Sequence, residues 1–207
     1  NLKSNDKHRT WGTARIILLI LVILFGIAIR VVHYKWDLHD SDEAIVGIMG
    51  MHILSGEKFP VFNYGYPKLG SLEAYITAVM FRLFGISILS HRIALLFLSA
   101  VYVTAMYFLA VRLFKSREAG FWTLCFTLIC PSYLCFWNLA GRAVYQESLT
   151  LGTLIFLFLH QAVWRNERKA LFFLVFGVLI GIAWWTGGLV LYYVLPAAIF
   201  FFIKDKL

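Results

Sequence analysis

Apolar residues along the chain come in long runs, and short polar segments separate these runs. The runs 14–33 and 88–112 are each long enough to cross a membrane as a helix, since a hydrocarbon core of about 30 Å needs about 20 residues. Further runs follow at 119–137, 148–164, 169–185 and 188–203. The pattern predicts an all-α fold, a polytopic transmembrane helical bundle with about six spans.

The stretch 34–87 departs from this pattern because it holds two shorter amphipathic segments. In 42–56, apolar residues recur at the spacing of one helical face. In 69–85, an apolar face is accompanied by Glu73 and Arg82, and charges at membrane depth are costly. We therefore predict two juxtamembrane helices on the membrane surface, inside a first outer loop.

Composition and charge support a membrane protein. Hydrophobic residues make up 61% of the chain and charged residues 14%, whereas soluble domains carry about 25% charged residues. The net charge of +8 comes from Lys and Arg between apolar runs, so we expect no nucleic-acid partner. With the N-terminus in the cytoplasm, most of these cations fall in cytoplasmic connections, as the positive-inside tendency requires. A rival layout, in which 69–85 also spans and the N-terminus is outside, divides the charges equally well but places Glu73 and Arg82 inside a span.

In the favoured layout, four polar segments lie on the non-cytoplasmic side. Their candidate residues are Asp42 and Glu43, then Tyr64, Tyr66 and Lys68, then Arg142, Tyr145, Gln146 and Glu147, and finally Trp185. A carboxylate can deprotonate a hydroxyl or bind a metal, a cation can neutralise a phosphate leaving group, and an aromatic ring can stack on a sugar. The simpler interpretation is a solvated acid, an Arg142 that reaches for lipid headgroups and an interfacial belt of aromatics.

Several short motifs occur in the order found in a known family. They are Ser41–Ala44 (SDEA), Gly65–Leu69 (GYPKL), Phe84–Gly85 followed by Arg92, Arg142 with an acid five residues later, and Gly181–Thr186 (GIAWWT). Together they resemble the N-terminal membrane module of GT-C glycosyltransferases, which include protein O-mannosyltransferases, aminoarabinose transferases of lipid A and oligosaccharyltransferase catalytic subunits. The resemblance covers residues 15–203, and the second acid is Glu147 where many relatives carry Asp.

This resemblance implies a membrane glycosyltransferase that moves a sugar from a polyprenyl-phosphate-linked donor to an acceptor at the non-cytoplasmic face. The implied catalytic carboxylates are Asp42, Glu43 and Glu147, with Asp42 as base or metal ligand. The implied donor phosphate-binding residues are Lys68 and Arg142, and the implied substrate-binding residues are Tyr64, Tyr66, Tyr145, Gln146 and Trp185. Metal dependence stays open: a divalent ion, Mg²⁺ or Mn²⁺, would use Asp42 and Glu147.

We expect residues 1–207 to form a single transmembrane module that lacks the C-terminal part of a full-length family enzyme. Its expected location is the bacterial or archaeal cell membrane, in contact with membrane lipid and membrane-protein partners. The missing spans favour an alternative, a non-catalytic GT-C-derived subunit packed in a larger membrane complex. A transporter is a third class, but no span shows the Gly- and Pro-broken symmetry of inverted repeats.

Overall fold

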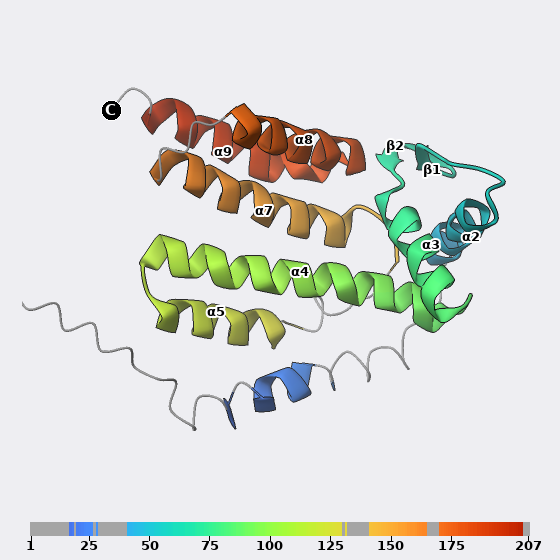
Figure 1. Ribbon diagram of the computed structural model, residues 1–207, viewed down its shortest axis with the longest axis horizontal. Coiled ribbons are helices and arrows are strands. Elements are labelled where there is room, and N and C mark those ends of the chain that lie inside the picture. Colours follow the sequence, from blue (N-terminus) through green and yellow to red (C-terminus); the bar gives the residue numbers. More distant parts are fainter. Residues whose placement is uncertain are drawn as a thin grey trace, which may run out of the picture.

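Helices make up most of the structure, and a short two-stranded hairpin accompanies them (Figure 1). The computed structural model describes residues 17–18, 20–26, 28, 41–129, 131, 141–164 and 170–204. The helices are α2 (Ser41–Ser55), α3 (Leu72–Phe84), α4 (Ile88–Phe114), α5 (Arg117–Leu128), α7 (Tyr145–Trp164), α8 (Ala170–Thr186) and α9 (Leu191–Lys204), with a 3₁₀ turn η1 (Gly188–Val190) before α9. Residues 20–26 are also helical. The prediction of a helical fold is confirmed.

Local sequence explains where several helices begin and end. Ser87 precedes α4, and its Oγ accepts a hydrogen bond from the Ser90 N–H at 3.1 Å. Ser116 caps α5 in the same way through the Ala119 N–H at 3.3 Å. Each cap satisfies a backbone donor that the helix itself leaves unpaired. Gly85 ends α3 with a φ of 83°, a conformation that glycine adopts without strain.

Helix α7 lies between α4 on one side and α8 and α9 on the other (Figure 1). Aliphatic side chains fill the space between α7, α8 and α9: Leu151, Ile155, Leu159, Ala183, Val190 and Ala197. Helices α7 and α9 approach closely at Gly152, because a Cβ at that position would lie 2.3 Å from the Tyr193 ring. We call α7, α8 and α9, apart from the first turn of α7 and the end of α8, the apolar body.

The segment that the sequence predicts as a polar connection contains a hairpin. Strand β1 (Phe62–Asn63) pairs antiparallel with β2 (Tyr66–Gly70). Gly65, with a φ of 80°, provides the turn between them. These strands are not predicted from the sequence, since they are short and lack an alternation of apolar and polar residues. The Trp185 Nε1–H donates to the Val61 carbonyl at 2.9 Å, which fastens the hairpin to the end of α8.

Both predicted amphipathic segments are helices, α2 and α3, and they pack against each other. Their placement on a membrane surface stays a prediction. Helix α3 also packs on α4, and the hairpin contacts α8. These elements gather at one end of the bundle, together with the start of α7 (Figure 1). We call this region, formed by α2, α3, the hairpin, the first turns of α4 and α7, residues 141–144 and the end of α8, the polar end.

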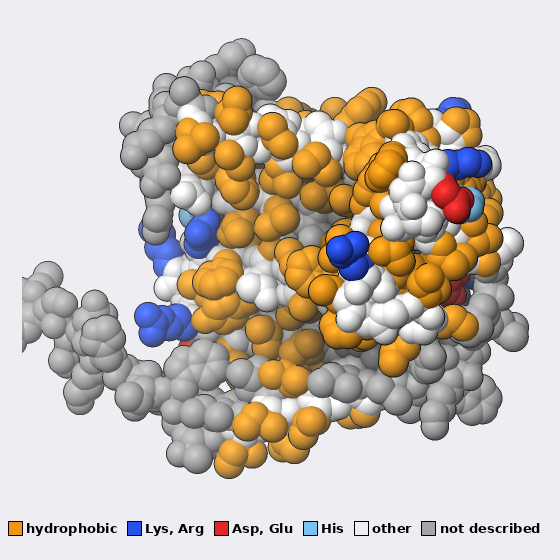
Figure 2. All heavy atoms as spheres, turned by 45° about the vertical axis from the view of Figure 1, so that its right-hand side comes forward, with side chains coloured by type: hydrophobic (Ala, Val, Ile, Leu, Met, Phe, Trp, Pro, Cys, Tyr) orange, Lys and Arg blue, Asp and Glu red, His pale blue; other side chains and the backbone are white. Residues whose placement is uncertain are grey.

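Among the described residues, only α4 is both long and apolar enough to cross a membrane on its own. Shorter apolar stretches occur at Leu171–Thr186 and Gly188–Phe200. By this measure the prediction of about six spans is not met. The predicted spans 14–33 and 119–137 lie partly outside the described residues, and α7 carries polar residues at both ends. Figure 2 nevertheless shows a face that is mostly hydrophobic, with few charged side chains.

Candidate functional site

A cavity of about 250 Å³ opens at the polar end between α2, the hairpin and the segment before α7. Its lining residues are Asp42, Ile45, Val46, Asn63, Tyr66, Leu69, Arg142, Ala143, Val144 and Tyr145. We call it the polar cavity. Four residues that the sequence singles out as candidates share its wall: Asp42, Tyr66, Arg142 and Tyr145. They come from three segments that are far apart in the chain.

Asp42 lies in the first turn of α2, where the unpaired N–H groups of a helix favour a negative charge. The Tyr66 hydroxyl donates a long hydrogen bond to Asp42 Oδ1, with 3.4 Å between the oxygens. Strand β2 presents Tyr66 to α2, so the hairpin orients the carboxylate. The cavity therefore combines an acid, a guanidinium and two phenol rings in one space.

Three other predicted residues take structural positions beside the cavity. The Tyr64 hydroxyl lies 3.1 Å from His52 Nδ1 and links the hairpin to α2. Gln146 is buried, and its amide donates to Thr150 Oγ1 at 3.4 Å. Trp185 fastens the hairpin to α8 by the hydrogen bond described above. None of the three belongs to the lining of the polar cavity.

Lys68 lies exposed on β2 and is not part of the cavity wall. The two remaining candidate carboxylates, Glu43 and Glu147, are buried and also lie outside that wall. Of the three acids proposed to be catalytic, the structure thus brings only Asp42 to the cavity. Sequence spacing could not separate them, because Asp42 and Glu43 are neighbours and helical geometry turns their side chains to different faces.

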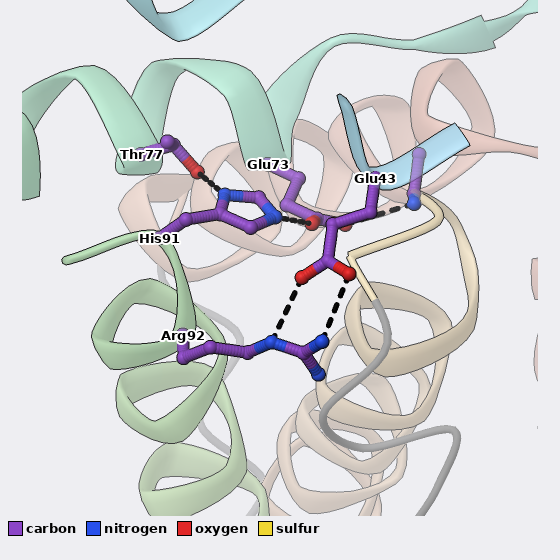
Figure 3. A network of polar contacts seen from close by, with 6 residues as sticks. Glu43, Glu73, Thr77, His91 and Arg92 are labelled. Atoms are coloured by element: carbon purple, nitrogen blue, oxygen red, sulfur yellow. Dashed lines mark hydrogen bonds and ion pairs between the residues drawn. The ribbon is translucent and has the colours of Figure 1, made fainter. Parts of the chain in front are cut away.

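Glu43 forms a two-point ion pair with Arg92 across α2 and α4 (Figure 3). Arg92 Nε lies 2.8 Å from Oε1 of Glu43, and Arg92 Nη2 donates to Oε2 at 2.8 Å. Arg92 is only 2% exposed. A guanidinium that meets a carboxylate at two points orients it as well as stabilising it. Glu43 therefore holds two helices together and is already engaged by Arg92.

A second polar chain runs from α3 through α4 to the segment before α7 (Figure 3). Thr77 Oγ1 lies 2.8 Å from His91 Nδ1, and His91 Nε2 lies 3.5 Å from Oε1 of Glu73. The other Glu73 oxygen, Oε2, accepts a hydrogen bond from the Ala143 N–H at 2.9 Å. Glu73 is 1% exposed. This chain ends on the backbone of a residue that lines the polar cavity.

Among the described residues of the polar end, three carboxylates are buried, and Arg92 carries the one buried guanidinium. Glu147 is fully buried, and neither of its oxygens makes a hydrogen bond of normal geometry to the described residues. Burial raises the pKa of Glu73 well above its usual value, and the nearby Glu147 carboxylate raises that pKa further. The Ala143 N–H and, more weakly, Arg92 act in the opposite direction. The net effect disfavours the charged form of Glu73.

The backbone before α7 is strained where it lines the cavity. Ala143 and Val144 have φ values of 55° and 68°, in the left-handed region that a β-branched residue rarely adopts. The Tyr145 N–H donates to the Ala143 carbonyl at 2.8 Å, which closes a tight turn. Strain of this kind persists only when surrounding contacts enforce it, and it is common at ligand sites.

Glu73, Thr77, His91 and Arg92 were not among the site residues that the sequence predicts. Glu73 was interpreted as a charge that kept 69–85 out of the membrane, and Arg92 as part of a helix start. A sequence signal did exist. An ionisable residue inside an apolar run is costly unless it has a partner, so the positions of Glu73, His91 and Arg92 indicate a buried polar cluster.

A second, largely apolar cavity of about 390 Å³ lies between α2, the end of α3 and the start of α4. Its lining residues are Glu43, Ala44, Gly47, Ile48, Met51, Phe81, Ile86, Ser87, Ile88 and His91. We call it the apolar cavity. Glu43 and His91 are the ionisable residues in its wall. Both belong to the buried network, by which we mean Glu43, Glu73, Thr77, His91 and Arg92 (Figure 3). The network therefore borders this cavity and, through Ala143, the polar cavity as well.

The residues do not fit the metal site that the resemblance implied. Among the described residues, no three His, Cys, Asp or Glu side chains are grouped so that they could hold a metal ion. Asp42 lines the polar cavity and Glu147 does not. We derive no step through a metal.

No protein-family model, no curated protein and no solved structure matches the chain.

Proposed function

We propose that the chain is a membrane glycosyltransferase of GT-C type that uses a polyprenyl-phosphate-linked sugar and acts at the non-cytoplasmic face of a cell membrane. One observation carries this proposal: the polar cavity gathers Asp42, Tyr66, Arg142 and Tyr145 from separate segments. A carboxylate can act as the base in transfer of a sugar from a phosphate, and a guanidinium can bind the phosphate that leaves.

Each of these side chains has a role in the proposed reaction. The acceptor hydroxyl oxygen attacks the anomeric carbon, and the bond from that carbon to the phosphate oxygen breaks. The Asp42 carboxylate takes the hydroxyl proton, while Tyr66 holds that carboxylate by its hydrogen bond. The polyprenyl phosphate leaves with the bonding electrons, and Arg142 neutralises its charge. Tyr66 and Tyr145 supply faces on which the sugar can lie.

The surroundings of the polar cavity suit a lipid-linked donor. The apolar cavity adjoins the same buried network and has space for part of a polyprenyl chain. Large hydrophobic side chains are exposed along α8 and α9, among them Leu171, Leu174, Tyr192, Leu195 and Ile199. An apolar surface of this extent favours contact with lipid. In the proposed topology, the apolar runs 14–33, 88–112, 119–137, 148–164, 169–185 and 188–203 cross the membrane, and α2 and α3 lie on its outer surface.

A non-catalytic membrane subunit is the second candidate, and one observation favours it. Only one of the three acids expected to be catalytic lines the polar cavity, since Glu43 is engaged by Arg92 and Glu147 is buried. In that case the polar cavity would bind a lipid phosphate without turnover. The exposed faces of α8 and α9 would then contact other subunits.

Transfer assays with an Asp42→Asn variant test the proposal. Wild-type chain in lipid nanodiscs is given a panel of polyprenyl-phosphate monosaccharides, and release of the sugar to water or to added acceptors is measured. Loss of the carboxylate base lowers the rate by about 100-fold or more. The matched control is Glu57→Gln, because Glu57 is exposed beyond α2 and lines neither cavity.

Two outcomes would count against catalysis. An Asp42→Asn variant that turns over at the wild-type rate removes Asp42 from the mechanism. A wild-type chain that binds these donors without turnover, and that co-purifies with a larger membrane complex, identifies the non-catalytic subunit.

A further inference from the structure

The segment 141–144 has an unfavourable backbone conformation, which contacts from other parts of the structure must stabilise. Ala143 and Val144 are both in the left-handed region, and the cost of such residues is met only by surrounding contacts. This segment and the start of α7 carry Arg142 and Tyr145 into the polar cavity. The contacts that hold the segment therefore decide whether the two side chains reach the cavity at all.

One of these contacts is a hydrogen bond from a side chain remote in sequence. Ala143 lies outside the described helices, and Glu73 Oε2 on α3 accepts a hydrogen bond from its N–H at 2.9 Å. A buried N–H without an acceptor would be costly, so the carboxyl group of Glu73 stabilises this particular backbone conformation. Figure 3 shows Glu73 beside His91.

Two close approaches restrict the same segment from other sides. At Gly141, an added Cβ would lie 2.0 Å from His91 Nε2 and 3.0 Å from Glu73 Oε1. At Gly187, an added Cβ would lie 2.2 Å from a methyl carbon of Val144. The segment thus sits tightly between the Glu73–His91 pair and the end of α8.

We propose that Glu73 is a positioning residue: together with His91 and Thr77 it holds 141–144 so that Arg142 and Tyr145 line the polar cavity. Glu73 itself lies outside the wall of that cavity. The positioning applies to whatever binds there. Its importance for sugar transfer rests on the proposed function.

The contacts that link Thr77, His91, Glu73 and Ala143 suit a rigid support for segment 141–144. Arg92 contacts Glu43 at two points, whereas Glu73 lies beside His91 and accepts the hydrogen bond from the Ala143 N–H. Glu73 can then use one oxygen toward the imidazole and the other as acceptor for the N–H. Thr77 orients the imidazole from its far side at 2.8 Å. All four of these residues are at least nine-tenths buried, so water cannot readily replace a lost partner.

Hydrogen exchange of the Ala143 amide tests the proposal without any assumption about activity. The full chain in nanodiscs is compared as wild type, Glu73→Met and Glu73→Gln, with exchange resolved to single amides. The apolar variant removes the acceptor, and we expect exchange at Ala143 to become about tenfold faster or more. The glutamine variant keeps an acceptor oxygen, and we expect exchange within about threefold of wild type.

Thr77→Val is the matched control within the network. It removes the hydroxyl that orients His91 but leaves the bond from Ala143 to Glu73, so Ala143 exchange should change less than in Glu73→Met. If Glu73→Met does not fold, the wild-type chain decides the matter, because the Ala143 amide must be among its slowly exchanging amides. Fast exchange at Ala143 in the wild type, or unchanged exchange in a folded Glu73→Met variant, overturns the proposal.

A binding measurement connects the positioning to the cavity. Dodecyl phosphate is titrated into the same nanodiscs, and we expect Glu73→Met to weaken its binding by about tenfold while Glu73→Gln binds as wild type does. A wild-type chain that shows the exchange pattern but binds no alkyl phosphate retains the positioning role and loses the proposed function. Binding that survives in Glu73→Met, despite faster exchange at Ala143, overturns the claim that this segment places Arg142 at the ligand.

Discussion

The polar end and the apolar body of this molecule bury opposite kinds of side chain. In the apolar body, α7, α8 and α9 are joined by aliphatic residues such as Leu151, Ile155 and Val190. At the polar end, the fully buried side chains include Glu73, Arg92 and Glu147. Aliphatic packing tolerates many arrangements of similar volume, whereas a buried ionic network works only when each partner is in place. The interactions that depend most on exact geometry therefore lie at the polar end, beside the cavities.

Removing one member of the ion pair should break the polar end most severely. Arg92→Met leaves the Glu43 carboxylate buried without its cation, and we expect the free energy of unfolding to fall by about 3–5 kcal/mol. The measurement is reversible unfolding in detergent, followed by far-UV circular dichroism.

The double variant Glu43→Met/Arg92→Met is the control for that experiment. It removes both charges together, and apolar replacement of a buried ion pair is often neutral. We expect it to recover most of the lost stability. A double variant as unstable as Arg92→Met alone would show that packing of the long side chains, and not the charge, supports the contact between α2 and α4.

A substitution that overfills the apolar body should lower the free energy of unfolding without changing the polar end. Gly152→Ala places a methyl group where the Tyr193 ring lies, so α7 and α9 must separate. We expect a loss of about 1–3 kcal/mol in the free energy of unfolding. Exchange at Ala143 should stay at the wild-type rate. The control is Gly177→Ala on α8, where no atom lies within 4 Å of the added methyl group and the helix gains stability.

The same contrast explains what could be predicted from the sequence. Helices α2, α3, α4 and α7 were predicted within a few residues of their ends, because hydrophobic periodicity and run length are local signals. The hairpin was missed because its strands are too short to show a period. The helices of both regions follow from this local information.

The candidate site was predicted in part for a related reason. Asp42, Tyr66, Arg142 and Tyr145 were selected as polar residues in segments predicted to share one side, and the structure places them in one cavity. The bond between Glu73 and Ala143 joins positions 70 residues apart, and no local pattern encodes it. Ionisable residues within apolar segments were the available clue, but their partners depend on how α3 and α4 pack. Contacts of this kind depend on how the helices pack, whereas the lengths of apolar runs can be read directly from the sequence.

Two helix caps of the same chemistry, one in the polar end and one outside it, offer the finest comparison. Ser87 caps α4 beside His91 and Arg92, and its hydroxyl also lies 2.8 Å from that of Ser90. Ser116 caps α5 at the far end of α4. Replacement of either serine by alanine should cost about 1 kcal/mol of unfolding free energy. Only Ser87→Ala should also speed exchange at Ala143, because it loosens the helix turn that presents His91 to Glu73. Equal exchange in the two variants would show that the network does not depend on this turn, and that the polar end is held from α2 and α3 alone.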